Sequence, residues 1–171
     1  MKKYGLTAEF IEQWGKKLFR IKALISFGSV EAGELGGYVE KEDNLAQDGD
    51  AWVCDDAWVY GDARVYGDAE VYGNARVYGN AEVYGDADYL LIGRIGSRFS
   101  FTTFFKNKDK GITVSCGCFL GTIAEFRAKV TDTHGNNKHA KIYNLAADMA
   151  ELQILGEEYF DKLNANKSEP F

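Results

Sequence analysis

A six-residue pattern repeats seven times without a gap from Gly49 to Leu90, a stretch that we call the repeat segment. A short fixed period predicts a fold in which one small structural unit stacks on the next. In most units Ala and Val stand two residues apart, which is the alternation of a short strand with one face buried. Gly and Asp or Asn between the strands favour turns, since they tolerate positive φ. The units are GDAWVC, DDAWVY, GDARVY, GDAEVY, GNARVY, GNAEVY and GDADYL.

This spacing resembles the hexapeptide-repeat family of left-handed parallel β-helices, in which three units make one triangular coil. Val39 and Leu45 are in phase with Ala51, so the resemblance implies a left-handed parallel β-helix of about three coils over residues 37–90. Members of that family commonly form trimers packed side by side, and we therefore expect a homo-oligomer, with a trimer favoured.

Stacking at 18 residues predicts which outward side chains are neighbours on adjacent coils. Ion pairs, cation–π contacts and stacked rings across strands stabilise a sheet surface, whereas two like charges do not. Glu70 over Asp88 is the unfavourable pair. The favourable ones are Arg64 on Glu82, Trp58 on Arg76, Tyr60 on Tyr78, and Tyr66 on Tyr84.

Residues 1–36 are expected to be an N-terminal strand cap on the first coil. Thr7 suits the start of a short helical turn that reaches Trp14, and Gly15 would end it. Residues 17–27 (KLFRIKALISF) alternate as a strand does. The stretch LGGYVEKEDNLAQDGDAWV resembles the leader of hexapeptide-repeat proteins found in phages and prophages.

Residues 91–156 predict a small α+β domain with three strands and two helices, followed by a tail over residues 157–171. The domain includes the end of the first strand, which begins just before it; the predicted strands are 89–92, 99–106 and 112–119. Its motifs YLLIGRIGSRFSFTTFF, VSCGCFLGT and THGNNKHA resemble a domain that follows such repeats in phage proteins.

The two predicted helices lie beyond these strands. Thr122 and Glu125 form a capping box for the first, which ends at Gly135. The second covers residues 138–155 and places Ile142, Leu145, Met149 and Leu152 on one side.

Charge is distributed unevenly along the chain. Residues 37–90 carry 3 basic and 13 acidic residues, a net charge of −10, whereas residues 91–150 carry 9 basic and 4 acidic, a net charge of +5. One explanation of the acidic part is that turn positions favour Asp and leave it on a solvated surface. The alternative is that the acidic surface imitates nucleic acid and occupies the binding site of a DNA- or RNA-binding protein. The basic part is the better place for an anionic ligand, and nucleic acid itself is an unlikely partner for an acidic chain.

The turn from Gly93 to Arg98 combines glycines and Ser97 with two guanidinium groups. Glycines allow backbone amides to face a shared hollow, and Arg donates paired hydrogen bonds to phosphate or carboxylate. An ordinary exposed turn also explains this composition. The binding interpretation predicts that Arg94, Ser97, Arg98, Thr102 and Thr103 converge on one anion.

Both histidines of the chain lie between the two predicted helices, in HGNNKH. A helix end explains this segment, with Gly135 as terminator and Asn137 as the next cap. The functional interpretation is that His134, Lys138 and His139 face the same anion as the Arg turn. Acid–base catalysis by His lacks a partner carboxylate at a fixed spacing.

The chain has three cysteines, too few for a disulfide framework, which suits a reducing cytoplasm. Cys116 and Cys118 share a face of a predicted strand, where small half-buried residues, reactive thiols or a zinc site are the alternatives; we predict no metal and no cofactor. Cys54 takes the outward Tyr position of its unit. There is no apolar run of membrane length and no secretory leader, so we expect a soluble cytoplasmic protein without a membrane partner.

Hexapeptide-repeat acyltransferases and the related carbonic anhydrases place His on or near the coil, but residues 37–90 contain none. The sequence also lacks a P-loop, a nucleophile elbow and a dinucleotide fingerprint after a strand. We therefore expect a non-enzymatic protein.

The resemblances and the basic module together predict a phage or prophage binding protein, acting in the host cytoplasm. It would capture an anionic, nucleotide-type ligand or otherwise antagonise a host defence protein or system. The alternatives are a protein–protein inhibitor or assembly module that uses the acidic β-helix surface, and a divergent hexapeptide-repeat transferase that uses His134 or His139.

Overall fold

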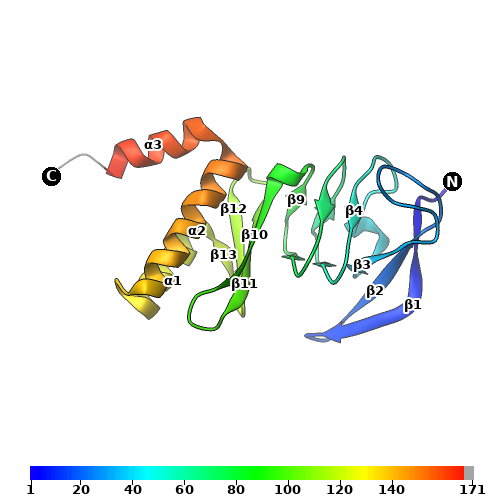
Figure 1. The fold of residues 1–171 in the computed structure, drawn as a ribbon, viewed down its shortest axis with the longest axis horizontal. Coiled ribbons are helices and arrows are strands. Elements are labelled where there is room, and N and C mark those ends of the chain that lie inside the picture. Colours follow the sequence, from blue (N-terminus) through cyan, green and yellow to red (C-terminus); the bar gives the residue numbers. More distant parts are fainter. Residues whose placement is uncertain (168–171) are drawn as a thin grey trace. The chain divides into compact units, whose positions relative to one another are not determined.

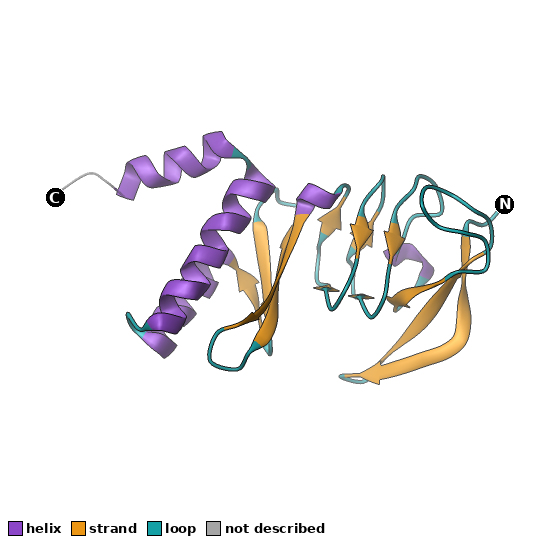
Figure 2. Ribbon diagram, viewed as in Figure 1, coloured by secondary structure: helices purple, strands orange, loops and turns teal. Residues whose placement is uncertain are grey.

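The computed structural model describes residues 1–167, which form two compact units, residues 1–86 and residues 87–167. The elements are drawn in Figure 1 and coloured by type in Figure 2. None of the described helices is long and apolar enough to cross a membrane. The predicted tail, 157–171, is helical over Glu157–Lys167, and its last four residues lie outside the described part.

The first unit begins with an antiparallel hairpin of β1 (Tyr4–Gln13) and β2 (Lys16–Ala23). The helical turn predicted from Thr7 to Trp14 is wrong, whereas the strand predicted after it is confirmed over β2. Tertiary pairing overrides the local capping signal, because Phe10 lies opposite Phe19 with ring centroids 5.9 Å apart.

Strand β3 (Leu35–Val39) continues this sheet on the other side of β2. A short 3₁₀ helix, η1 (Glu42–Asn44), follows it. The Asn44 side chain donates hydrogen bonds to the backbone carbonyls of Gly61 and Ala63, at 3.1 and 2.8 Å. This buried amide therefore connects η1 to the third unit of the repeat segment.

Six units of the repeat segment each form a strand of only two residues, and the Ala and Val of these units are fully buried. Each strand pairs in parallel with the one 18 residues away. The six strands are β4 (Trp52–Val53), β5 (Trp58–Val59), β6 (Arg64–Val65), β7 (Glu70–Val71), β8 (Arg76–Val77) and β9 (Glu82–Val83).

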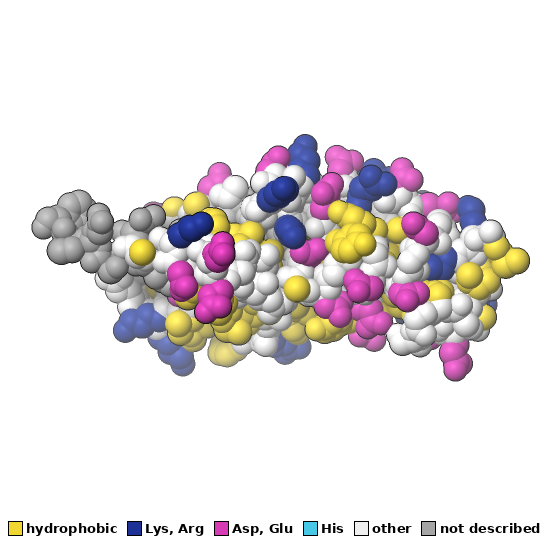
Figure 3. All heavy atoms as spheres, turned by 90° about the horizontal axis from the view of Figure 1, so that it is seen from above, with side chains coloured by type: hydrophobic (Ala, Val, Ile, Leu, Met, Phe, Trp, Pro, Cys, Tyr) yellow, Lys and Arg dark blue, Asp and Glu magenta, His cyan; other side chains and the backbone are white. Residues whose placement is uncertain are grey.

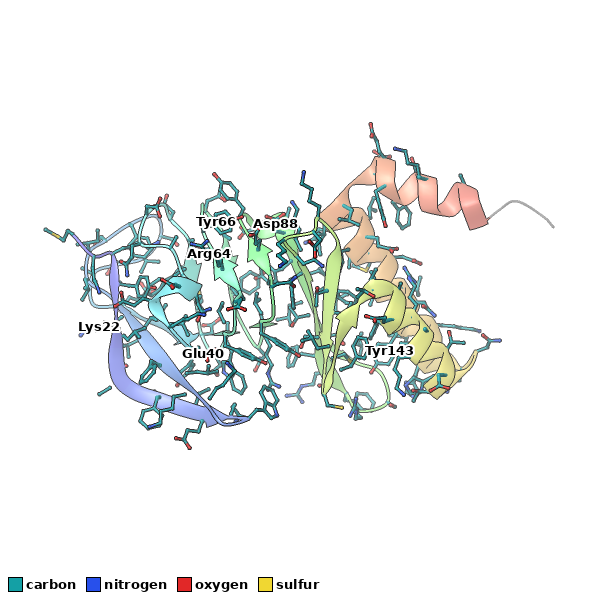
Figure 4. The ribbon with its side chains drawn as sticks, turned by 180° about the vertical axis from the view of Figure 1, so that it is seen from behind. Lys22, Glu40, Arg64, Tyr66, Asp88 and Tyr143 are labelled. Atoms are coloured by element: carbon teal, nitrogen blue, oxygen red, sulfur yellow. The ribbon has the colours of Figure 1, made fainter. Side chains whose placement is uncertain are left out.

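The predicted outward neighbours of the repeat segment are confirmed. Arg64 lies opposite Glu82, and the guanidinium of Arg76 lies 4.4 Å from the Trp58 ring centroid. The rings of Tyr60 and Tyr78 stack at 4.6 Å, while those of Tyr66 and Tyr84 meet edge to face at 5.1 Å. Arg64 and Tyr66 are labelled in Figure 4.

The predicted left-handed parallel β-helix of about three coils is nevertheless wrong. The short strands belong to separate sheets, and none of these sheets closes on itself: β4 pairs with β7, and β6 pairs with β9 and, through one isolated bridge, with Leu45. The remaining two, β5 and β8, extend the hairpin into a mixed sheet of order β1-β2-β3-β5-β8.

Local structure at both ends of the segment explains this difference. At the first expected coil, β3 pairs in parallel with β5 at a spacing of 20 residues instead of 18, and η1 takes the place of a strand. The seventh unit is also not a repeat strand, since Asp86–Asp88 form a second 3₁₀ helix, η2. The expected pair of Glu70 and Asp88 is replaced by a hydrogen bond of 2.8 Å from the Glu70 backbone N–H to the Asp86 carboxylate.

The second unit has an antiparallel sheet whose order follows the chain, with helices α1 and α2 on one face (Figure 1). The predicted three strands and two helices become four strands and three helices. The strands are β10 (Tyr89–Ile95), β11 (Ser100–Lys106), β12 (Ile112–Cys116) and β13 (Phe119–Thr122), and the helices are α1 (Ile123–His134), α2 (Lys138–Leu155) and α3 (Glu157–Lys167).

Two glycines account for the extra elements. Gly117, at φ +61°, turns the predicted strand 112–119 back on itself, so that β12 and β13 form a hairpin. Gly156, at φ +86°, ends α2 and separates it from α3. The predicted capping box of Thr122 and Glu125 is confirmed, as is the Asn137 cap, whose side chain accepts hydrogen bonds from the amides of His139 and Ala140.

The side of α2 that packs on the sheet is made of small residues and one ring. Ala140, Tyr143, Ala146, Ala147 and Ala150 are buried there. In contrast, Leu145, Met149 and Leu152 from the apolar side noted in the sequence are exposed, with 63%, 57% and 45% of their surface accessible. Small side chains allow a helix to lie close to the sheet, which is why the alanines take the inner side.

Candidate functional site

The second unit contains a cavity of about 280 Å³, formed where α1, α2 and the turns of the sheet meet. Helix α1 lines it with Phe126, Lys129, Val130, Thr133 and His134. Their spacing of three, four and seven residues from Phe126, with His134 adjacent, is that of one helix face. Two hairpin turns, strand β13 and Tyr143 of α2 complete the walls.

Arg98 reaches this cavity from the turn between β10 and β11. Its exposed guanidinium lies beside Gly117, where an added Cβ would stand 3.0 Å from Nη2 and 3.3 Å from Cζ. Cys116 and Cys118, on either side of this glycine, also line the cavity. A side chain at position 117 would therefore displace the guanidinium. The positive φ of residue 117 would add backbone strain.

Tyr143 points from α2 toward the sheet (Figure 4), and its hydroxyl packs against Gly96, where a Cβ would overlap it. Its ring meets Phe126 edge to face at 5.6 Å. Burial raises the pKa of the Tyr143 hydroxyl, the neighbouring Cys116 thiol raises it further, and Arg98 opposes the change. The hydroxyl is thus neutral at physiological pH and can donate a hydrogen bond.

The two histidines lie close together, His134 at the C-terminal end of α1 and His139 at the N-terminal end of α2. Their ring centroids are 5.7 Å apart, and His134 also stacks on Tyr143 at 5.8 Å. His134 lines the cavity, whereas His139 lies behind it. The Nδ1 atom of His139 is buried without a hydrogen-bond partner in the described part of the chain.

The threonines predicted for the site do not line the cavity. Thr102 is fully buried, and its hydroxyl donates a hydrogen bond of 3.3 Å to the Cys116 Sγ. It therefore supports a wall of the cavity from behind. Thr103 is also buried, but as the next residue along β11 it lies on the opposite face of the sheet.

The other predicted residues lie outside the cavity lining. Arg94 is exposed on β10, with its guanidinium 6.0 Å from the Phe101 ring centroid. Ser97 is exposed in the turn, and Lys138 is exposed as the first residue of α2. Of the predicted set, the structure thus brings Arg98 and His134 to one cavity, with His139 adjacent.

Sequence reasoning missed Tyr143, Lys129 and Phe119 as parts of this site. A signal for Tyr143 was present, because it follows His139 by four residues and so shares a helix face with it. Lys129 likewise follows Phe126 by three residues. Phe119 could not be placed, since the hairpin of β12 and β13 was predicted as one strand.

The polar groups of the cavity suit an anion, and its walls suit a ring. Arg98 and Lys129 carry positive charge, while Phe119, Phe126 and Tyr143 provide aromatic surface. No carboxylate is among the described residues that line it. No cluster of three or more potential metal ligands occurs in the described part of the chain.

A larger cavity of about 530 Å³ lies in the first unit, over strands β6 and β9. Its charged lining consists of Asp43, Asp48 and Glu82 with Arg64 as the cation. Three carboxylates against one guanidinium disfavour an anion. The smaller cavity is therefore the better candidate for the anionic ligand expected from the sequence.

Comparison with known proteins found no family model that matches this chain and no match among curated proteins.

Proposed function

We propose that the second unit binds a small anionic ligand of nucleotide type in the cavity of Arg98 and His134. The observation that carries this proposal is the meeting of these two side chains, one from the turn after β10 and one from the end of α1, on one aromatic-walled cavity. The basic character of residues 91–150, with a net charge of +5, supports it.

Each part of such a ligand has a matching surface. A phosphate would accept hydrogen bonds from the Arg98 guanidinium, which offers paired donors, and would be attracted by Lys129. A base would lie against the rings of Phe119 and Tyr143. The volume is at the small end of ligand cavities, which favours a mononucleotide-sized portion.

Binding without turnover is the simplest chemistry for these residues. A general base is normally oriented by a neighbouring acceptor and faces the proton that it removes. His134 instead stacks on Tyr143, and none of the described lining residues is a carboxylate. Its role in the proposal is to donate a hydrogen bond to the anion.

We further propose that the protein sequesters a nucleotide signal of a host defence system in the cytoplasm. The support is the sequence resemblance to phage and prophage repeat proteins, together with the cavity. The cysteines Cys54, Cys116 and Cys118 are all unpaired, as a reducing compartment requires.

Calorimetric titration of the full chain tests the binding step, with nucleoside monophosphates, cyclic nucleotides and ADP-ribose as probes. Arg98→Ala should weaken binding of the best probe by about 10- to 100-fold, since a charge-assisted hydrogen bond contributes about 1.5–3 kcal/mol. Arg94→Ala is the matched control: it removes the same charge from the same hairpin but outside the cavity.

The control should change affinity less than about threefold, as expected for a distant exposed charge. Absence of binding for every probe would overturn the proposal. Equal losses in the two variants would also contradict it, because they would show attraction to net charge rather than to this cavity.

A further inference from the structure

Helix α2 is apolar on two opposite sides. Its inner side, rich in alanine, packs in the core of the second unit. Its outer side carries Leu145, Met149 and Leu152, all largely exposed. The intervals of four and three residues put these three side chains in one line along the helix.

This outer stripe is unusual for a surface that faces only water. Single exposed hydrophobic residues are normal on proteins, and Figure 3 shows such side chains among charged ones. Three large ones in line form a continuous strip, which is typical of an interaction surface. Tyr159 of α3, 44% exposed, adds an aromatic residue shortly beyond the end of α2.

The charges at the ends of the stripe indicate what covers it. Lys138 and Lys141 are exposed at the beginning of α2, and Glu157 and Glu158 are exposed just after its end. Neither Lys141 nor Glu157 has an ion-pair partner within residues 1–167. The stripe therefore has a positive end and a negative end, and two antiparallel copies would be complementary in charge.

We propose that the outer stripe of α2 packs against the same stripe of a second copy of this chain, with the two helices antiparallel. Lys141 precedes Leu145 by four residues, and Glu157, the first residue of α3, follows Leu152 by five, so along the chain the two flank the stripe on either side of its middle. A two-fold axis at that middle brings the Lys141 end of each copy to the Glu157 end of the other. Both ion pairs form at once, and the leucines and methionines of the two copies interdigitate between them.

The expected association is weak and concentration-dependent. The stripe is narrow, so the interface falls below the standard size of about 800 Å² per partner. Sedimentation velocity between about 1 and about 200 µM protein covers dissociation constants on the order of micromolar. The wild-type chain should shift from monomer to dimer across this range.

Leu152→Glu should reduce the association at least tenfold, because it buries a carboxylate against the partner stripe. Leu120→Glu is its matched control, since Leu120 on β13 is equally exposed, at 45%. Both positions are on the surface, so both variants should keep the wild-type circular dichroism and melting profile. Met149→Glu provides a second variant of the stripe.

A charge exchange tests the antiparallel arrangement. Lys141→Glu should weaken the dimer, because it places two carboxylates opposite each other, and adding Glu157→Lys in the same chain should restore it. A chain that stays monomeric at every concentration would overturn the proposal. A trimer, or a dimer that Leu152→Glu and Met149→Glu leave intact, would overturn it as well, and failure of the restoration would contradict the antiparallel arrangement.

Discussion

Two glycines determine where the polar groups of the candidate site lie. Gly117 leaves room for the Arg98 guanidinium, and Gly96, which is buried at φ +74°, leaves room for the Tyr143 hydroxyl. At both positions a side chain would meet a polar group of the cavity. The placement of Arg98 and Tyr143 therefore depends on the absence of a side chain at positions 96 and 117.

Gly96→Ala should lower the free energy of unfolding by about 2–4 kcal/mol, which combines the strain of a positive φ with the overlap of Cβ and the Tyr143 hydroxyl. Gly135→Ala is the control in the same unit, because Gly135 also has a positive φ but no atom within 4 Å of an added Cβ. Its loss should be smaller than that of Gly96→Ala, because only backbone strain of about 1–3 kcal/mol remains. Urea denaturation measures both; equal losses would mean that Tyr143 does not occupy this position.

At the residue scale, local signals in the sequence were the most dependable. The Thr122 capping box, the Asn137 cap and the end of α1 at Gly135 were all predicted correctly, since each depends on a few neighbouring residues. The meeting of Arg98 and His134 could be stated only as a hypothesis, because it depends on how distant turns are packed.

At the scale of elements, α1 and α2 are joined by one arginine. Arg127 donates hydrogen bonds of 2.7 Å to both Asp148 and Glu151, and weaker ones to Asn144. The Glu151 side chain is only 6% exposed. A carboxylate at this depth needs its partner, so Arg127 holds in place the helix pair that forms two walls of the cavity.

Arg127→Met should destabilise the protein by about 3 kcal/mol, because it leaves the Glu151 carboxylate buried and unpaired. Adding Glu151→Met should recover most of this loss. Lys129→Met, on the same helix but in an exposed pair with Asp132, should change stability by less than about 1 kcal/mol. Chemical denaturation of the four proteins decides the point: a loss that persists in the double variant would show that Arg127 acts by packing alone.

The elements that were mispredicted share a physical cause. Thr7 resembles a helix cap locally, but pairing with β2 makes its segment a strand. The strand predicted over residues 112–119 included Gly117, because the pattern of a single sequence does not show that this residue has a positive φ. The sequence pattern placed the large apolar residues of α2 on one side of the helix, but packing density against the sheet selects the alanines as the inner side.

At the scale of the whole molecule, the period of the repeat segment predicted pairing but not architecture. The 18-residue register is observed at Trp58 and Arg76 and at Arg64 and Glu82. The β-helix did not follow, because η1 and η2 interrupt the stack at its two ends. A repeat fixes the relation between neighbouring units, whereas the closure of a sheet depends on what lies before and after them.

Charge, in contrast, distinguishes the two cavities at this scale. The basic stretch in residues 91–150 contains the cavity of Arg98 and His134, and the acidic stretch contains the cavity of Asp43, Asp48 and Glu82. Composition can distinguish these two parts because it averages over many residues. It cannot identify the individual side chains that form a wall.

The central claim is that the cavity of the second unit holds an anionic ligand. The most direct test is a titration of the full, isotope-labelled chain with a nucleoside monophosphate, followed by amide chemical shifts in NMR spectra. We expect saturable shifts at Gly117, Cys118, Thr133 and His134, which surround the cavity, and little change in residues 49–86. Shifts confined to residues 49–86, or no saturable shift near Arg98, would contradict it.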